Sequence, residues 1–408
     1  AWKKQWAERV RENPGLKRQL EERLGVINGE VGRPESFDAL HEIIDRQHYR
    51  LARWKAGAHE INYRRFFAID SLVGLRMENP EVFAESHALL QRLVREGKVT
   101  GVRIDHIDGL RLPEDYLHRL QTLNDPDQPR PLYTLVEKIL APGEELPATW
   151  PVHGTTGYEF IAQLAQLLVD GSADGALSAA YRNFTGDDSA YADAVYRNKR
   201  MIVAELFADV VSNLGGSLAE LVNADRHWQD LTRYELTIAL GEFLATFSTY
   251  RTYRRGEGAL AAEQRKVIEE AYEKTLERNP RVDPEAFIFV RDLLTGDYPA
   301  AGAPAEYRER LLKWVETFQQ YTGAAMAKSV EDTTFYTYVR FVALNEVGGD
   351  PSSSGGTIEA FHEENARRLR TSPHALLATS THDTKLAEDV RARLYALSEL
   401  AGEWERWT

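Results

Sequence analysis

The chain has 408 residues, with 50 Lys and Arg against 63 Asp and Glu, a formal net charge of −13 and no cysteine. The acidic balance argues against a nucleic-acid partner, because phosphate binding needs clustered Lys and Arg, but it is compatible with a neutral substrate such as a sugar. Without cysteine there are no disulfides, no thiol catalysis and no Cys-ligated zinc.

No apolar run approaches the roughly 18–20 residues that span a bilayer, and the first residues are charged and carry no signal-peptide core. We therefore expect a cytoplasmic protein with no membrane partner. The chain does not begin with methionine and opens inside a predicted helix, which favours a fragment of a longer polypeptide.

The first half of the chain predicts helices followed by a strand–helix–strand unit. Amphipathic patterns predict helices over 1–25, 38–56, 80–97 and about 113–123, several beginning at Pro and one ending at Gly97. Short apolar runs at 99–104 and 132–136 predict two strands buried on both faces. Their spacing of about 40 residues is typical of a parallel βαβ unit.

The second half predicts a helical block followed by a third strand. A loop over 141–158 leads into a mostly helical region over 158–320. A flexible loop lies at 348–356, and its lack of a Lys-Ser/Thr ending argues against phosphate binding. A third strand is predicted at 375–379, followed by a helix from about Leu386.

Three carboxylates end the three predicted strands. Asp105, Glu137 and Asp383 each follow an apolar run and precede a loop, and in a parallel α/β barrel such positions meet on one face. Carboxylates crowded there repel one another, so at least one should have a raised pKa. One ionised and one protonated carboxyl is the pair that glycosidic chemistry needs. Arg103 beside Asp105 favours its ionised form, which makes Asp105 the better nucleophile and Glu137 the better acid/base.

Other interpretations remain open from the residues alone. Arg103 and Asp105 could form a structural ion pair, and strand-end acids are often helix caps. A metal site of Asp105, His106 and His382 lacks any recognised ligand spacing. A Ser-His-Asp hydrolase lacks the G-x-S-x-G turn.

The three acidic segments resemble motifs of the α-amylase superfamily. Residues 101–105 (GVRID) resemble its strand-four motif, Val136-Glu137 its strand-five motif, and His382-Asp383 its strand-seven motif. The resemblance implies a partial (β/α)8 TIM barrel, about strands four to seven, with large helical insertions. It implies Asp105 as nucleophile, Glu137 as general acid/base and Asp383 as transition-state stabiliser, with Arg103 orienting the nucleophile and His382 binding the sugar.

Longer stretches narrow the resemblance to a trehalose-forming member of that superfamily. They are residues 41–55, 60–80, 101–110, 135–140, 150–160, 327–351 and 380–394. The resemblance implies a maltooligosaccharide substrate and no cofactor. The reaction would convert the reducing-end α-1,4 linkage into an α,α-1,1 linkage without releasing glucose. Trp150, His153, Tyr158 and Lys385 are candidates for holding that glucose.

Two departures from the superfamily pattern carry consequences. Ile107-Asp108-Gly109 replaces the usual Lys-His pair after the nucleophile, which leaves His106 as a candidate substitute. No Asp-x-x-x-Asn-His strand-three motif is present. We therefore expect strands one to three and eight to lie in the missing remainder of the polypeptide, which would be the chain's natural partner.

Four segments follow from this reading. They are a helical segment leading into the barrel (1–95), strands four and five with their loops (96–160), a mostly helical insertion (161–323), and strands six and seven with the next helix (324–408). The rival functions are a plain α-glucan hydrolase and a non-catalytic glucan-binding fragment. A helical interaction protein would leave the strand-end acids unexplained.

Overall fold

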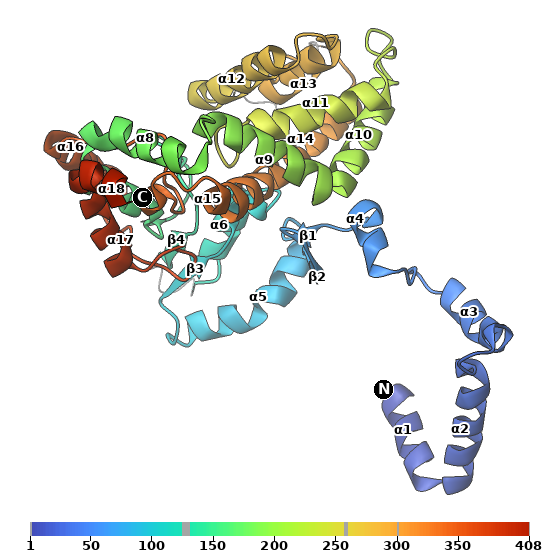
Figure 1. The fold of residues 1–408 in the computed structure, drawn as a ribbon. Coiled ribbons are helices and arrows are strands. Elements are labelled where there is room, and N and C mark those ends of the chain that lie inside the picture. Colours follow the sequence, from blue (N-terminus) through green and yellow to red (C-terminus); the bar gives the residue numbers. More distant parts are fainter. Residues whose placement is uncertain (1, 125–130, 257–259, 300–301, 408) are drawn as a thin grey trace. The chain divides into compact units, whose positions relative to one another are not determined.

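The computed structural model describes residues 2–124, 131–256, 260–299 and 302–407. It divides into two compact units, Ala1–Glu60 and Ile61–Thr408. The helices of the first unit are α1 (Trp2–Glu12), α2 (Pro14–Asn28), α3 (Asp38–Asp45) and α4 (Gly57–Glu60) (Figure 1). The predicted helix over 1–25 is interrupted at Asn13, whose side chain caps α2 by accepting from the Leu16 N–H at 3.1 Å. Pro14 has no N–H with which to continue α1, so a new helix starts there.

The second unit is built on a short parallel sheet. Strands β3 (Gly101–Ile104) and β4 (Tyr133–Val136) pair in parallel, which confirms the two strands predicted there. Strand β5 (Gly154–Thr155) continues the sheet on the other side of β4, in the order β3-β4-β5. An antiparallel hairpin of β1 (Arg65–Phe66) and β2 (Ile69–Val73) forms a separate sheet.

Two helices cover this sheet. Helices α5 (Pro80–Arg95) and α6 (Pro113–Gln121) were both predicted, and each has proline in its first turn. Their apolar side chains share one core with those of the sheet, formed by Phe83, Ile107, Tyr116, Leu117, Leu120, Leu123, Leu132, Val136 and Trp150.

The third predicted strand, 375–379, is wrong as a strand. The segment has no regular secondary structure, although the Leu376 N–H donates to the Thr155 carbonyl at 3.2 Å and so holds it against β5. A Cβ on Gly157 would lie 2.5 Å from the Leu376 carbonyl, and one on Gly154 would lie 2.4 Å from the Ala375 Cβ. Both glycines also have positive φ, so the close approach depends on them.

The prediction from sequence therefore placed the third strand of the sheet at 375–379, whereas the structure has it at Gly154–Thr155. Strand β5 falls inside the predicted loop over 141–158, and residues 324–407 contain no strand. A two-residue strand is too short to show a period in the sequence, which is the physical reason that it was missed.

The remaining elements are helical. After β5 the chain forms α7 (Tyr158–Leu168), α8 (Asp174–Thr185), α9 (Tyr191–Glu205), α10 (Ala208–Val222), α11 (Arg233–Thr246), α12 (Ala262–Arg278), α13 (Glu285–Thr295) and α14 (Ala305–Met326). It ends with the π-helical segment η5 (Ala327–Thr334), α15 (Phe335–Thr337), the 3₁₀ turn η6 (Val342–Leu344), α16 (Ile358–Thr371), α17 (Glu388–Tyr395) and α18 (Ala401–Trp407).

The largest hydrophobic core belongs to this helical region. It runs from α9 to α14 and includes Phe243, Phe287, Phe289 and Phe318. Among the described residues no single helix is long and apolar enough to cross a membrane; only α9 and α10 taken together meet that test, and they are bent by 78°.

The helical region docks on the turn that follows β3. Gln320 of α14 donates to the Gly109 carbonyl at 3.0 Å, and Arg111 donates to Glu316 of the same helix at 2.7 Å. A Cβ on Gly323 would lie 3.7 Å from the Asp108 Cβ, so α14 passes close to this turn. The helices thereby form one wall of the space above the sheet.

A buried ion pair fixes the β1–β2 hairpin to α10. Arg65 donates to both carboxylate oxygens of Asp209, at 3.0 and 2.8 Å, and both side chains are buried. Its other guanidinium nitrogen pairs at 2.7 Å with Asp70, which is exposed. The pair holds Phe66 and Phe67 in place.

We expect Asp209→Ala to lower the free energy of unfolding by about 3–5 kcal/mol, because it leaves the Arg65 guanidinium without its buried carboxylate and with only the exposed Asp70 as a partner. Asp70→Ala is the matched control, since it removes an exposed partner of the same guanidinium and should cost no more than about 1 kcal/mol. Urea unfolding of the two variants measures the difference. Equal losses would contradict the assignment of the buried pair as the anchor.

Candidate active site

Three carboxylates from distant parts of the sequence line one cavity. Ile104 of β3 pairs with Val136 of β4, so the next residues, Asp105 and Glu137, leave the sheet at the same edge. Asp383 reaches the same space from the loop that follows the segment beside β5. All three line a cavity of about 370 Å³. The structure thus brings together the acids that the sequence placed at strand ends.

Arg103 lies between the first two carboxylates. Its Nη1 donates to Asp105 Oδ1 at 2.8 Å, and its Nη2 lies 3.7 Å from Glu137 Oε1. Arg103 and Asp105 occupy alternate positions along the chain and face the same side, as the period of two predicted. The guanidinium charge acts to lower the pKa of Glu137.

The pKa of Glu137 is raised by its surroundings. Burial raises its pKa, and the charges of Asp105 and Asp383 raise it further. The His106 N–H donates to Oε2 at 2.6 Å, and this hydrogen bond, like Arg103, acts in the opposite direction. The net shift is upward, which suits a general acid.

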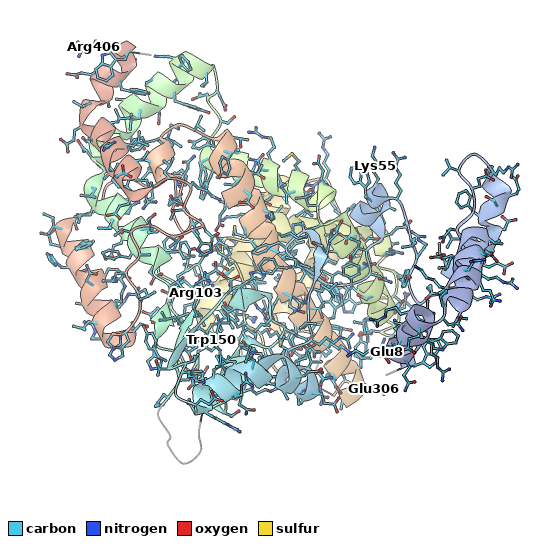
Figure 2. All side chains as sticks on the ribbon, turned by 90° about the horizontal axis from the view of Figure 1, so that it is seen from below. Glu8, Lys55, Arg103, Trp150, Glu306 and Arg406 are labelled. Atoms are coloured by element: carbon cyan, nitrogen blue, oxygen red, sulfur yellow. The ribbon has the colours of Figure 1, made fainter. Side chains whose placement is uncertain are left out.

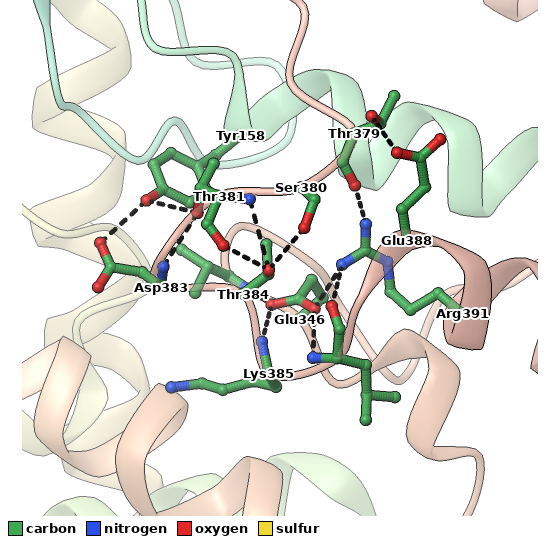
Figure 3. A network of polar contacts seen from close by, with 12 residues as sticks. Tyr158, Glu346, Thr379, Ser380, Thr381, Asp383, Thr384, Lys385, Glu388 and Arg391 are labelled. Carbon is green, nitrogen blue, oxygen red and sulfur yellow. Dashed lines mark hydrogen bonds and ion pairs between the residues drawn. The ribbon is translucent and has the colours of Figure 1, made fainter.

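Asp383 is held by its neighbours in the same loop and by α7 (Figure 3). The Tyr158 hydroxyl donates to Asp383 Oδ2 at 3.1 Å and accepts from the Thr381 hydroxyl at 3.1 Å. The His382 ring lies 3.1 Å from the same carboxylate oxygen. Tyr158 is itself buried, and burial raises the pKa of its hydroxyl, so it acts as a donor at neutral pH.

His106 lies in the wall of the cavity in an uncommon conformation. Its φ of 47° is in the left-handed region, and its ring packs 4.3 Å from the ring of Phe67 and 5.3 Å from that of Phe66. A Cβ on Gly109 would lie 2.3 Å from the imidazole, so only glycine fits there. Burial lowers the pKa of His106 to about 4, and the ring is therefore neutral at pH 7.

The four residues predicted to hold glucose divide into two pairs. Tyr158 and Lys385 line the cavity. Trp150 and His153 do not: Trp150, labelled in Figure 2, packs in the core edge-on to Tyr253, at 5.2 Å between ring centroids. His153 accepts the Thr134 N–H at 3.1 Å, which ties it to the side of β4. The His153 N–H also donates to the Thr134 carbonyl at 2.8 Å, so backbone pairing with β4 fixes its place.

Sequence reasoning missed a group of residues from η5. Lys328, Glu331 and Asp332 line the cavity, and Lys385 lies 3.2 Å from Asp332. Burial raises the pKa of Glu331 to about 7, and its carboxylate accepts from the Tyr250 hydroxyl. The π-helical turn, a geometry frequent at functional sites, delivers this group. The signal available in the sequence was a pair of adjacent acids, Glu331 and Asp332, within the stretch 327–351 that resembles the trehalose-forming enzymes.

The remaining lining residues are largely apolar or paired. They are Phe66, Phe67, Ile69, Asp108, Lys138, Ile139, Tyr250, Gly323, Ala327 and Val347. Over the described residues no group of three or more His, Asp or Glu side chains is arranged to hold a metal ion.

Carboxylates gathered above a short parallel sheet, with helices inserted around them, define an α/β enzyme fold of the amylase type. No family model matches the chain. Proteins of two Mycobacterium tuberculosis strains, CDC 1551 / Oshkosh and ATCC 25618 / H37Rv, both named as maltooligosyl trehalose synthase, are 36% identical to it over 387 residues. The match covers 94% of this chain and 46% of each relative.

Solved structures give the same result. The maltooligosyltrehalose synthase of Arthrobacter ramosus superposes with a TM-score of 0.77 at 33% identity, over 92% of this chain and 44% of that one. A Sulfolobus tokodaii structure described with the same enzyme name has a TM-score of 0.68 at 30% identity, over 90% and 43%. The chain is a homologue of the maltooligosyltrehalose synthases, and it spans about half the length of the curated relatives that it matches.

The neutral state of His106 makes stability depend on pH with a definite sign. Because its folded pKa of about 4 lies below the ordinary value of 6.5, the unfolded chain binds the proton more readily. This contribution to stability is present above pH 6.5 and is lost as the pH falls toward 4. His106→Asn, which tolerates the positive φ, should flatten the unfolding free energy over that range. An equally steep dependence in the variant would contradict the assignment; His382→Asn is the exposed control.

Proposed function

We propose that the chain carries the catalytic centre of an intramolecular transglucosylase that acts on maltooligosaccharides. The enzyme converts the reducing-end α-1,4 linkage into an α,α-1,1 linkage and so ends the glucan in trehalose. The observation that carries the proposal is the shared cavity of Asp105, Glu137 and Asp383 in a homologue of the maltooligosyltrehalose synthases.

The first step forms a covalent intermediate. Asp105 attacks the anomeric carbon of the penultimate glucose, a bond forms between its carboxylate oxygen and C1, and the C1–O4 bond to the terminal glucose breaks. Glu137 gives its proton to the departing O4. The Arg103 contact at 2.8 Å holds the Asp105 carboxylate in place, and the raised pKa of Glu137 supports a protonated acid.

The second step returns the same atoms to a new linkage. The terminal glucose turns in place, and its anomeric hydroxyl attacks C1 while Glu137, now ionised, accepts the hydroxyl proton. The Asp105 ester bond breaks as the 1,1 bond forms. Two inversions at C1 retain the α configuration. Asp383, hydrogen-bonded to Tyr158, stabilises the positive charge that develops on the sugar ring in both transition states.

Isomerisation in place of hydrolysis requires that glucose stays and water stays out. Phe66, Phe67 and Ile139 supply apolar wall to the cavity. Lys385 and Asp332, paired at 3.2 Å, offer a donor and an acceptor for sugar hydroxyls. The neutral His106 ring can hydrogen-bond a hydroxyl without adding charge. His382 lies beside Asp383 and is suited to bind the sugar on the other side of the cleavage point.

The partners and the location follow from the same proposal. The substrate is an α-1,4-glucan, and the enzyme works in the cytoplasm without a cofactor. The rest of the polypeptide supplies the barrel strands absent here, namely one to three and eight. Support comes from β3, which among the described strands pairs only with β4 and leaves its other edge free for a further strand.

Replacement of Glu137 by Gln should lower turnover of maltopentaose by about 10²–10⁴-fold, because the departing oxygen loses its proton donor.

Asp105→Asn should leave no covalent glycosyl adduct detectable by mass spectrometry with an activated 2-fluoro sugar. In the wild type, reducing ends should disappear without release of free glucose. Release of one free glucose for each linkage broken would identify a hydrolase. Binding of maltopentaose without any turnover would identify a glucan-binding module.

The pH profile should report Glu137. Because the acid must be protonated in the first step, kcat/KM should fall as the pH rises through its raised pKa. In Asp105→Asn the like charge is absent, so the pKa of Glu137 should decrease. Carbon-13 NMR of labelled glutamate carboxyls, with Glu137→Gln to assign the signal, measures both values. An unchanged or higher pKa in Asp105→Asn would contradict the electrostatic coupling.

A further inference from the structure

The loop of residues 379–386 carries Asp383, His382 and Lys385 to the cavity but has no regular secondary structure of its own. Its internal contacts are short-range hydroxyl bonds, such as the Thr384 hydroxyl donating to the Thr381 carbonyl at 2.8 Å. Such bonds shape the turn locally but do not fix its place relative to the sheet. Something outside the loop must do so.

Glu346 binds the far end of this loop. Its Oε1 accepts the Lys385 N–H at 2.8 Å, and its Oε2 accepts the Leu386 N–H at 3.3 Å (Figure 3). The side chain is only 4% exposed. A buried carboxylate that accepts two successive backbone N–H groups behaves as a fixed anchor, because any shift of the loop would leave those groups without a partner.

Arg391, on α17, joins both ends of the same loop. Its Nη1 donates to Glu346 Oε2 at 2.8 Å and to the Leu386 carbonyl at 2.9 Å. Its Nη2 donates to the Thr379 carbonyl at the start of the loop. The planar guanidinium therefore spans the two ends, a task that its rigid fork of donors suits and a lysine ammonium does not.

The anchor is also connected to the strand that bears Glu137. Val347, next to Glu346, packs in one apolar cluster with Ile139 and Tyr158. Ile139 lies two residues after Glu137, and Tyr158 is the donor to Asp383. A buried ion pair is weak as a source of stability, since its desolvation offsets its attraction, so its placement here points to geometry.

We propose that Glu346 and Arg391 are positioning residues that hold the 379–386 loop so that the Asp383 carboxylate faces the Asp105–Glu137 pair. The inference rests on the proposed function for its chemistry. Neither residue lines the cavity, so both act through Asp383 and its neighbours and not on the substrate.

The test is a double-mutant cycle of Arg391→Lys with Asp383→Asn. Arg391→Lys keeps the charge but cannot reach Glu346 and both carbonyls together. It should lower kcat by about 10²-fold, the effect of a misplacement of about 1 Å, with KM little changed. In the Asp383→Asn background the same substitution should change kcat by less than threefold, because the group through which it acts is already lost. Fluoride release from a maltosyl fluoride keeps the weak variants measurable.

Folding is controlled separately. Arg340→Lys is the matched control variant. Arg340 is similarly buried and donates to the Asp174 carboxylate and to the Pro351 carbonyl. It does not contact the 379–386 loop. It should leave kcat unchanged at a comparable loss of stability by urea unfolding. If Arg391→Lys does not fold, Glu346→Gln with Arg391→Met removes both charges and enters the same cycle.

The outcomes separate the two proposals. Additive effects of Arg391→Lys and Asp383→Asn, or a crystal structure of Arg391→Lys with the loop unmoved, would overturn the positioning role. A full-length wild-type enzyme that does not convert maltopentaose would overturn the proposed function. In that case the loop position in the Arg391→Lys crystal structure would still decide whether Glu346 and Arg391 hold it.

Discussion

The parallel register of β3 and β4 places two carboxylates side by side, and their mutual repulsion is the constraint around which the site is arranged. Ile104 pairs with Val136, so Asp105 and Glu137 must leave the sheet together. At an effective dielectric constant near 20, two full charges about 4 Å apart repel by about 4 kcal/mol. Arg103, next to Asp105, offsets part of this repulsion, and the rest contributes to the raised pKa of Glu137. This electrostatic difference between the two acids is what the proposed mechanism uses.

A buried lysine adds a positive charge beside the cavity. Lys138, which follows Glu137, is buried, and its Nζ lies 3.4 Å from Asp108 and 2.8 Å from Glu144. Burial alone would lower its pKa, but those two carboxylates raise it, so the ammonium stays charged. The Lys138 ammonium offsets part of the negative charge of the carboxylates that line the cavity. Asp108, which also borders the cavity, is thus paired with a buried ammonium.

The sequence was sufficient to predict the elements with a clear hydrophobic pattern. It was not sufficient to predict the shortest strand or the contact that the segment 375–379 makes with it. Helices α5 and α6 begin at a proline, and strands β3 and β4 are each followed by an acid, so their bounds can be recognised in the sequence. Strand β5 has two residues and shows no period, and the 375–379 segment meets β5 through one hydrogen bond where Gly154 and Gly157 permit contact. Asp105, Glu137 and Asp383 could be found because each ends an apolar run. Glu331 could not, because its burial depends on Tyr250 and on the turn of η5.

The helical region is therefore part of the site and not an appendage to a barrel. Its last long helix, α14, is docked against the β3 turn by Gln320 and Arg111, and η5 continues from α14 into the cavity. Lys328, Glu331 and Asp332 reach the carboxylates only because this docking holds. An open strand-end site admits water as readily as sugar, whereas a site closed by a second, independently packed core can exclude it. We infer that the helices around the sheet help to exclude water from the cavity, while the sheet edge and the 379–386 loop place the three acids in it.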